Sequence, residues 1–203
     1  MDPKKLDSYY FKAKKEGYLA RSIYKLKEID EKYRILQQGH RVLDLGAAPG
    51  SWMQYAAQKI GDRGLLVGID LNPIQIPSTD RILTIQGDIL TYPFADLTKE
   101  HGLFHAVVSD VAPKTTGQRD RDHEVSIELC NMAFDVALKS LRTGGSFVSK
   151  MYQGEHLKPF LQRLRPHFDM VKSQKPASSR SESKEVFVVG LKFTSSRNST
   201  PKT

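Results

Sequence analysis

Hydrophobic and polar positions along this chain alternate between two periods. Seven short apolar runs predict β-strands at residues 41–45, 65–70, 81–86, 105–110, 145–151, 170–174 and 185–193. Apolar residues at helical spacing predict four helices at residues 21–35, 51–60, 124–141 and 155–164. Strands and helices therefore alternate through most of the chain.

This alternation predicts an α/β fold. Strands that are separated by helices form a mostly parallel sheet with helices on both faces. The last two strands have no helix between them, which predicts a closing hairpin and one antiparallel strand. The expectation is one domain with a seven-stranded mixed sheet.

Composition indicates the class of partner and the cellular compartment. The 203 residues carry a formal net charge of +8, and the sequence pI is about 9.5, which favours a polyanion such as a nucleic acid. The single cysteine, Cys130, lies in an apolar helical run and is expected to be a buried structural thiol. No apolar run approaches the roughly 20 residues of a membrane span, and the N-terminus lacks a hydrophobic signal core. We expect a cytoplasmic protein that is not in a membrane and acts as a monomer.

The two ends of the chain differ from the middle. Residues 1–20 interleave lysines with aromatic residues without clean periodicity, so this arm either orders on RNA or is a solvated tail. Residues 195–203 are polar and are expected to be disordered. The domain itself is expected to span residues 21–194.

The first predicted strand leads into a loop of small residues, GAAPG, between Gly46 and Gly50. Small residues let a ligand approach the backbone, and the next helix offers amide donors. The loop is not the GxGxxG of dinucleotide sites, its Pro49 removes a donor, and no Walker lysine follows. A ligand with an amino-acid portion and no phosphate fits this loop better.

Two acids follow the next two strands. Asp70 ends the second strand, where an acid typically accepts hydrogen bonds from ribose hydroxyls. Asp88 follows the third strand, where it can bind an adenine amino group while Ile89 covers the ring. Loop and acids together resemble a class I S-adenosylmethionine-dependent methyltransferase with a Rossmann-like sheet, so S-adenosylmethionine is the expected cofactor. No metal site is expected.

The fourth strand indicates the methyl acceptor. It ends in the segment SDVAP at Asp110, without the Pro-Pro-aromatic pattern that grips a planar amine. No cysteine nucleophile lies nearby. A hydroxyl is therefore the favoured acceptor.

Five stretches in order strongly resemble the FtsJ/RrmJ family of RNA ribose 2′-O-methyltransferases: RSIYKLKEID, DLGAAPGSW, SDVAP, GGSFVSKMYQGE and KPASSRSESKEVFVVG. The resemblance covers nearly the whole chain and implies a catalytic tetrad of Lys25, Asp110, Lys150 and Glu185. The cofactor positions that it implies are Gly50, Trp52, Asp70, Asp88 and Asp110. One departure is Ser51, where bacterial relatives often have glycine, and a serine is harmless at a helix start.

The role of Lys150 is open at this stage. A ribose hydroxyl must lose its proton as it attacks, and a free lysine with a pKa of about 10.4 is charged at neutral pH. Lys25 and the sulfonium would lower the pKa of Lys150, whereas Asp110 and Glu185 would raise it. Lys150 is therefore either the proton acceptor or a cation that steers the hydroxyl and stabilises the developing alkoxide.

A basic loop at residues 172–184 leads directly into Glu185, so it is expected to border the catalytic pocket. Phosphate contacts are expected from this basic loop and from the opposite rim of the pocket; the residues are Lys172, Lys175, Arg180, Lys184, Arg21 and Lys27. A solvated basic loop is the alternative. The expected substrate is a uridine of 23S ribosomal RNA in the large subunit. Alternatives are a tRNA or mRNA-cap methyltransferase, and a non-catalytic RNA-binding assembly factor.

Overall fold

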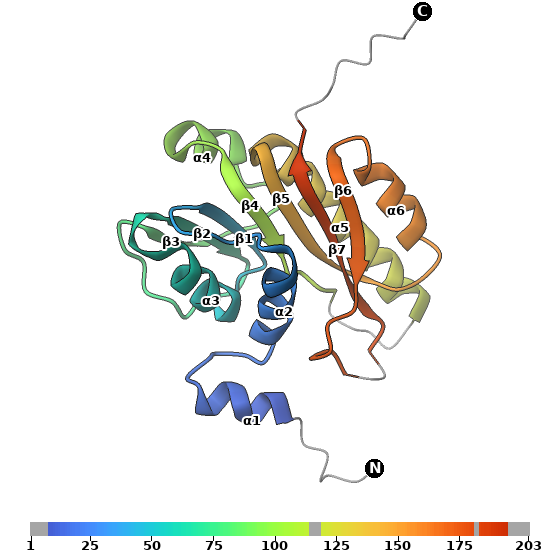
Figure 1. Ribbon diagram of the computed structural model, residues 1–203, viewed down its shortest axis with the longest axis horizontal. Coiled ribbons are helices and arrows are strands. Elements are labelled where there is room, and N and C mark those ends of the chain that lie inside the picture. The colour runs from blue at the N-terminus through green and yellow to red at the C-terminus, as the bar shows by residue number, and fades with distance from the viewer. Residues whose placement is uncertain (1–7, 114–118, 181–182, 195–203) are drawn as a thin grey trace, which may run out of the picture.

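The computed structural model describes residues 8–113, 119–180 and 183–194 (Figure 1). Its helices are α1 (Ser8–Lys15), α2 (Ile23–Tyr33), α3 (Ser51–Ile60), the short 3-10 helix η1 (Gly61–Arg63), α4 (Phe94–His101), α5 (Arg119–Ser140) and α6 (Leu157–Leu164). Its strands are β1 (Arg41–Leu45), β2 (Leu65–Asp70), β3 (Ile82–Gln86), β4 (Phe104–Ser109), β5 (Leu141–Tyr152), β6 (Phe168–Gln174) and β7 (Glu185–Phe193).

The strands form one seven-stranded sheet in the order β3-β2-β1-β4-β5-β7-β6. Neighbours from β3 to β5 pair in parallel, whereas β7 pairs antiparallel with both β5 and β6. This arrangement confirms the predicted mixed sheet with its closing hairpin. Because β7 runs against β5, the start of β7 lies beside the end of β5.

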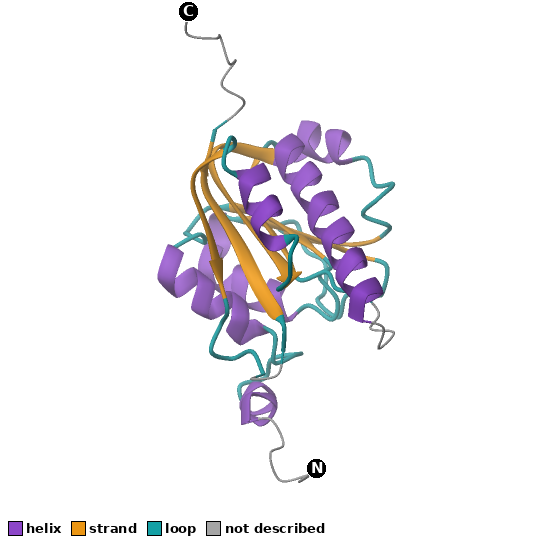
Figure 2. Cartoon of the chain, turned by 90° about the vertical axis from the view of Figure 1, so that its right-hand side faces the viewer, coloured by secondary structure: helices purple, strands orange, loops and turns teal. Residues whose placement is uncertain are grey.

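Helices lie on both faces of the sheet (Figure 2), and a hydrophobic core fills the space between the sheet and the helices on each face. One face packs against α4, α5 and α6, and the other packs against α2 and α3. Alternate residues of a strand supply the two cores, as Val107 and Val108 do on β4. Burial on both faces explains why these strands are continuous apolar runs.

The structure differs from the sequence predictions mainly in two helices. Helix α4 was not predicted, because only Phe94 and Leu97 in it are buried. Helix α1 was not predicted either, because Ala13 is its one buried residue and its aromatic side chains hide the period. Tyr9 nevertheless packs against Tyr24 of α2, with the ring centroids 5.3 Å apart.

Other boundaries shifted by a few residues. Strand β5 begins at Leu141, before the two glycines at which the sequence predicted its start, and α5 begins at Arg119. Among the described residues no helix is both long and apolar enough to cross a membrane. The predicted disordered tail and the first seven residues of the predicted arm lie outside the described residues.

Candidate active site

The predicted cofactor residues gather at one end of the sheet, where the parallel strands β1 to β4 finish. β1 lies between β2 and β4, so the loop after β1 is flanked by the ends of both neighbours. The chain order of the strands reverses here, and such a switch point is where open α/β sheets bind ligands.

The loop after β1 is held in place by backbone contacts and close packing. The amides of Gly46 and Ala47 both donate to the carbonyl of Ile69 on β2, at 2.9 and 3.2 Å. Gly46 has a φ of +76°, and a Cβ there would lie 2.5 Å from Val111 Cγ2. Gly50 has a φ of +122°, and a Cβ there would lie 2.5 Å from Ile76 Cγ1. Only glycine fits both positions without strain.

Asp70 and Asp88 lie at this same edge. One Asp70 oxygen accepts the Ala48 amide of the loop at 3.0 Å, and the other accepts the Asn72 amide at 2.8 Å. Asp88 accepts the Leu90 amide at 2.9 Å. Both carboxylates shape their loops and retain lone pairs for a ligand, which fits the hydroxyls and the amino group of an adenosine.

Ile89 is placed differently from its acidic neighbour. It is 9% exposed and belongs to the core under α4 and α5. Contact with an adenine ring stays a prediction for this residue.

The unusual state of Asp44 on β1 was not predicted from the sequence. Its side chain is buried, and neither carboxylate oxygen has a hydrogen-bond partner among the described residues. Burial, followed by the charges of Asp110 and Asp70, raises the pKa of Asp44 well above its ordinary value. A buried acid without a partner beside the loop fits a site built for a cationic ligand, and S-adenosylmethionine is such a ligand.

Lys150 and Asp110 form the first of two ion pairs. Lys150 Nζ lies 2.8 Å from Asp110 Oδ1 and also donates to the Asp110 carbonyl at 2.7 Å. Burial lowers the pKa of Lys150, but the charge and hydrogen bond of Asp110 outweigh burial, and Glu185 and Tyr152 add to their effect. The pKa of Lys150 therefore lies above its ordinary value, and the amine is charged at neutral pH.

Lys25 and Glu185 form the second ion pair. Lys25 Nζ lies 2.6 Å from Glu185 Oε2, and the ammonium lies 5.9 Å from the ring centre of Phe187. Burial raises the pKa of Glu185, but the charge and hydrogen bond of Lys25, followed by Lys150 and Ser183, outweigh burial and hold it below its ordinary value.

The antiparallel register brings the two pairs together. Lys150 lies opposite Phe187, and Tyr152 lies opposite Glu185. Directly opposed residues share a face, so Lys150 and Glu185 project from the same side of the sheet, and α2 brings Lys25 to that side. All four predicted tetrad residues meet, although they come from four separate parts of the chain.

Trp52 stabilises the segments that carry Lys25 and Glu185. It is 2% exposed, its indole N–H donates to the Ser22 carbonyl at 2.9 Å, and its ring packs against Phe187. Ser51 Oγ also lies 2.9 Å from Ser22 Oγ. These contacts fix the start of α2, which carries Lys25. That Trp52 touches the cofactor stays a prediction.

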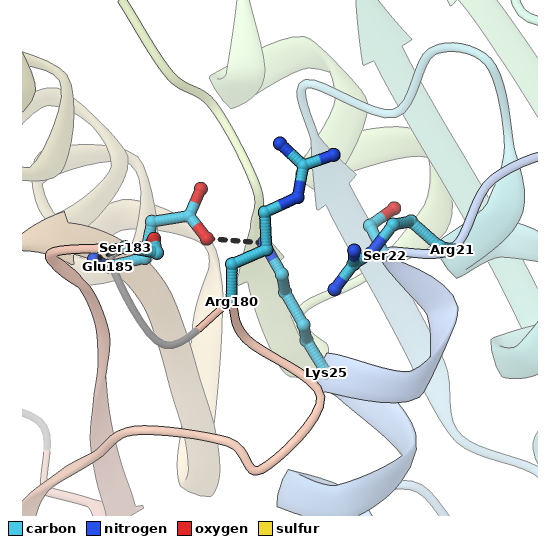
Figure 3. A pocket seen from close by; sticks show the side chains of 6 residues that line it. All are labelled: Arg21, Ser22, Lys25, Arg180, Ser183 and Glu185. Atoms are coloured by element: carbon cyan, nitrogen blue, oxygen red, sulfur yellow. Dashed lines mark hydrogen bonds and ion pairs between the residues drawn. The ribbon is translucent and has the colours of Figure 1, made fainter. Parts of the chain in front are cut away.

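A pocket of about 350 Å³ opens beside the second ion pair (Figure 3). Its lining residues are Arg21, Ser22, Lys25, Arg180, Ser183 and Glu185. In Figure 3 the Arg180 side chain extends over the Lys25–Glu185 pair, and the Arg21 side chain lies on the other side of Lys25 from Glu185. The two predicted RNA-binding arginines therefore border the predicted catalytic residues.

A residue that the sequence analysis missed holds the basic loop in place. The two carboxylate oxygens of Glu28 on α2 accept the amides of Ala177 and Ser178, at 2.6 and 2.9 Å. Arg21 also donates to the Ser178 carbonyl. The loop that carries Arg180 is thereby anchored to the helix that carries Lys25.

The other predicted RNA-binding lysines lie outside the lining of this pocket. Lys175 donates to the Ser183 carbonyl at 2.7 Å and so braces the basic loop. Lys172 and Lys184 are exposed, and Lys27 is half-buried. Contact between these lysines and RNA stays a prediction.

Comparison with known proteins identifies the family of this arrangement. A model of the FtsJ-like methyltransferase family matches residues 18–193. The ribosomal RNA large subunit methyltransferase E of Syntrophobacter fumaroxidans is 46% identical over 188 residues, which cover 92% of this chain and 95% of that protein. The protein of the same name from Bdellovibrio bacteriovorus is 43% identical, covering 91% of this chain and 95% of that protein.

Solved structures agree on the fold. A ribosomal RNA methyltransferase from Plasmodium falciparum superposes with a TM-score of 0.78 at 27% identity, covering 89% of this chain and all of that one. Fibrillarin from Aeropyrum pernix with bound S-adenosyl-L-methionine superposes with a TM-score of 0.53 at 18% identity, covering 77% of this chain and 68% of that one. The second likeness concerns the fold alone.

Proposed function

Because this chain belongs to the FtsJ-like methyltransferase family, we propose that it transfers a methyl group from S-adenosylmethionine to a ribose 2′-hydroxyl of large-subunit ribosomal RNA. The observation that carries the proposal is the pairing of Lys150 with Asp110 beside the pairing of Lys25 with Glu185, at the edge that holds the cofactor loop. A uridine is the proposed nucleoside, and the proposed compartment is the cytoplasm. The monomeric state stays a prediction.

Lys150 acts in this proposal as a fixed cation. Its amine is already protonated and is aimed by two hydrogen bonds to Asp110, so it has a proton to donate and no lone pair with which to accept one. A hydrogen bond from Lys150 to the 2′-oxygen would point an oxygen lone pair at the methyl group. It would also stabilise the alkoxide charge that develops as the hydroxyl proton passes to a solvent water molecule.

The remaining residues hold the reactants. The cofactor supplies the methyl group as an electrophile on a positively charged sulfur. Asp70 and Asp88 would bind its adenosine portion, and the Gly46 to Gly50 loop, which has no room for side chains at its two glycines, would let it lie against the backbone. The second ion pair positions the ribose, and the rim arginines bind flanking phosphates.

Two substitutions separate chemistry from cofactor binding. Lys150→Ala should abolish methyl transfer in a single-turnover assay and leave the affinity for S-adenosylmethionine nearly unchanged. Asp88→Ala should weaken that affinity first, as measured by calorimetry. Lys139→Ala is the control, because Lys139 is an exposed lysine in the last turn of α5. Transfer at the normal rate by Lys150→Ala would refute the assignment of Lys150.

The substrate is tested by incubating the protein with labelled cofactor and, separately, naked ribosomal RNA, transfer RNA and intact large subunits. Mapping the methylated nucleotide then identifies the site. Binding should also weaken steeply between about 50 and 200 mM salt, because phosphate contacts release counterions. Methylation confined to transfer RNA, or binding insensitive to salt, would contradict the proposal.

A further inference from the structure

A second pocket lies at the opposite end of the sheet from the tetrad. The β4 and β7 arrows in Figure 1 point to opposite ends of the sheet; Asp110 directly follows β4, whereas Leu191 and Lys192 of this pocket lie at the end of β7. The cavity has a volume of about 370 Å³ and is bordered by the residues before β1, the first residues of β4 and β5, and the last residues of β7. We call it the rear pocket. Ser146 in its lining and Lys150 lie four residues apart on β5, about 13 Å at the usual rise of a strand.

The lining of the rear pocket is strongly basic. Its basic side chains are Arg34, His40, His105, Arg142 and Lys192, and none of its described lining residues is an aspartate or glutamate. The pKa of His105 is lowered to about 4, first by burial and then by the charges of His40, Arg142 and Arg41. Burial and Arg142 also lower the pKa of His40, against smaller raising effects of the Ile35 carbonyl and Asp30. Both histidines are therefore held neutral, and the positive charge of the lining comes from Arg34, Arg142 and Lys192.

The hydrogen bonds of His105 leave two donors facing each other. Its Nδ1 accepts the backbone amide of Arg41 at 3.0 Å, so the proton of the neutral ring is on Nε2. That Nε2 lies 3.0 Å from Nη1 of Arg142, and a guanidinium can only donate. Two N–H groups at this distance repel each other unless an acceptor lies against both of them.

The surroundings of this donor pair suit a tetrahedral oxyanion. The rings of His40 and His105 stack with their centroids 4.4 Å apart, which fixes the orientation of His105. Gly144 has a φ of +81°, and a Cβ there would meet nothing within 4 Å, so the backbone beside Arg142 is open. An arginine fork beside exposed backbone is a common phosphate-binding arrangement.

We propose that the rear pocket binds a phosphate group between Arg142 and His105, and that its occupant is a phosphodiester from a second segment of the substrate RNA. The RNA part of this proposal rests on the proposed function. The site is too far from Lys150 to hold the nucleotide that is methylated. It would instead favour a large folded RNA, which can contact both ends of the sheet, over a short oligonucleotide.

The first experiment tests the phosphate site without RNA or activity. The imidazole C2-proton NMR signals of His40 and His105 are followed while sodium phosphate is added, with sodium chloride of equal ionic strength as the control. Phosphate should shift both signals saturably and raise the titration midpoint of His105. Arg142→Gln should abolish these shifts. The absence of a saturable shift in the wild type would overturn the proposal.

The second experiment identifies the source of the phosphate. Arg142→Gln should weaken binding to isolated large ribosomal subunits about fivefold and reduce the slope of log K against log salt by about 0.7 to 0.9, the effect of one lost phosphate contact. The rate of methyl transfer at saturating subunits and the affinity for a short oligonucleotide should be unchanged. Lys192→Gln should act in the same direction. Arg165→Gln removes an equal charge at the exposed end of α6 and should leave subunit binding within twofold.

The outcomes separate the possibilities. Equal losses in Arg142→Gln and Arg165→Gln would mean that only net charge matters, which overturns the site. Phosphate-induced shifts without any effect on subunit binding would overturn the RNA assignment and leave a site for free phosphate. Failure of the wild type to methylate any RNA would refute the proposed function, whereas the NMR titration would still decide whether the rear pocket binds phosphate.

Discussion

Replacing Glu185 by glutamine tests whether the Lys25–Glu185 pair stabilises the fold as well as positioning the ribose. At the observed 2.6 Å and an effective dielectric constant of about 20, the Coulomb attraction is about 6 kcal/mol. Desolvation of two buried charges offsets most of it, so the intact pair contributes little net stability. Removing one charge is different, because Lys25 is only 9% exposed and would keep, among the described residues, the face of Phe187 and a neutral amide.

Breaking a fully buried pair typically costs about 3–5 kcal/mol. The Glu185 side chain is 21% exposed, and glutamine retains an acceptor, so we expect Glu185→Gln to cost about 2 kcal/mol. With a urea m-value of about 2 kcal/mol per molar, the unfolding midpoint should fall by about 1 M at pH 7. Adding Lys25→Met should recover part of this loss, because it removes the unpaired charge.

The pH dependence of this effect has a definite sign. The pKa of Glu185 is lowered in the folded protein, so its stabilising effect is complete above the ordinary glutamate value of 4.5. The effect is lost as the pH falls through the lower folded value, and the two proteins should then converge. Asp62→Asn breaks an exposed pair with Arg81 and should not move the midpoint. Equal midpoints for Glu185→Gln and the wild type at pH 7 would refute this reasoning.

Three further predictions follow from buried groups and from the cofactor loop. The pKa of Asp44 is raised in the folded protein, so its effect on stability is most favourable below the ordinary aspartate value and is lost as the pH rises through the folded value. The urea midpoint of Asp44→Asn should therefore rise relative to that of the wild type between pH 5 and 8. A constant difference between the two midpoints would contradict this. Gly50→Ala should cost about 2–4 kcal/mol by urea unfolding and weaken cofactor binding, because it adds a clash with Ile76 to the φ strain, whereas Gly39→Ala adds strain alone and should cost about 1 kcal/mol; equal losses would exclude the clash. Burial raises the pKa of Cys130 to about 11, against smaller effects of Ser149 and Lys150, so a thiol reagent at pH 8 should react at least about 100-fold more slowly with folded than with urea-unfolded protein.

The sequence predicted the sheet well because the buried strands are apolar runs, and β2 and β4 lead into the acids Asp70 and Asp110 at the ligand edge. It did not predict α4 and α1 because each buries only one or two residues, and the hydrophobic period is then too weak to detect. In α1 the aromatic residues gain their partners from α2, as Tyr9 does from Tyr24. Tertiary packing therefore decides the helix where periodicity does not.

The candidate site shows the same limit. Asp110 and Lys150 could be placed from the strand ends, because both follow or end apolar runs. The sequence shows that Lys25 lies outside the apolar stripe of its helix, but it does not show that Lys25 is buried. That burial depends on Glu185, which lies 160 residues later. The anchor from Glu28 to the basic loop spans about 150 residues and has no local pattern. Contacts of this kind depend on the register between β5 and β7, which the sequence alone does not determine.

The charges around the active site divide into two groups with separate tasks. The tetrad contributes two cations and two anions at close range, so it is neutral as a unit and adds little long-range attraction for RNA. That attraction must come from cations outside the tetrad, such as Arg21 and Arg180 on the rim. Salt screens such exposed charges more strongly than buried pairs. Within the neutral tetrad, the negative charge of Asp110 therefore keeps Lys150 protonated for the methyl transfer. The cations of the rim determine how tightly RNA binds at a given salt concentration.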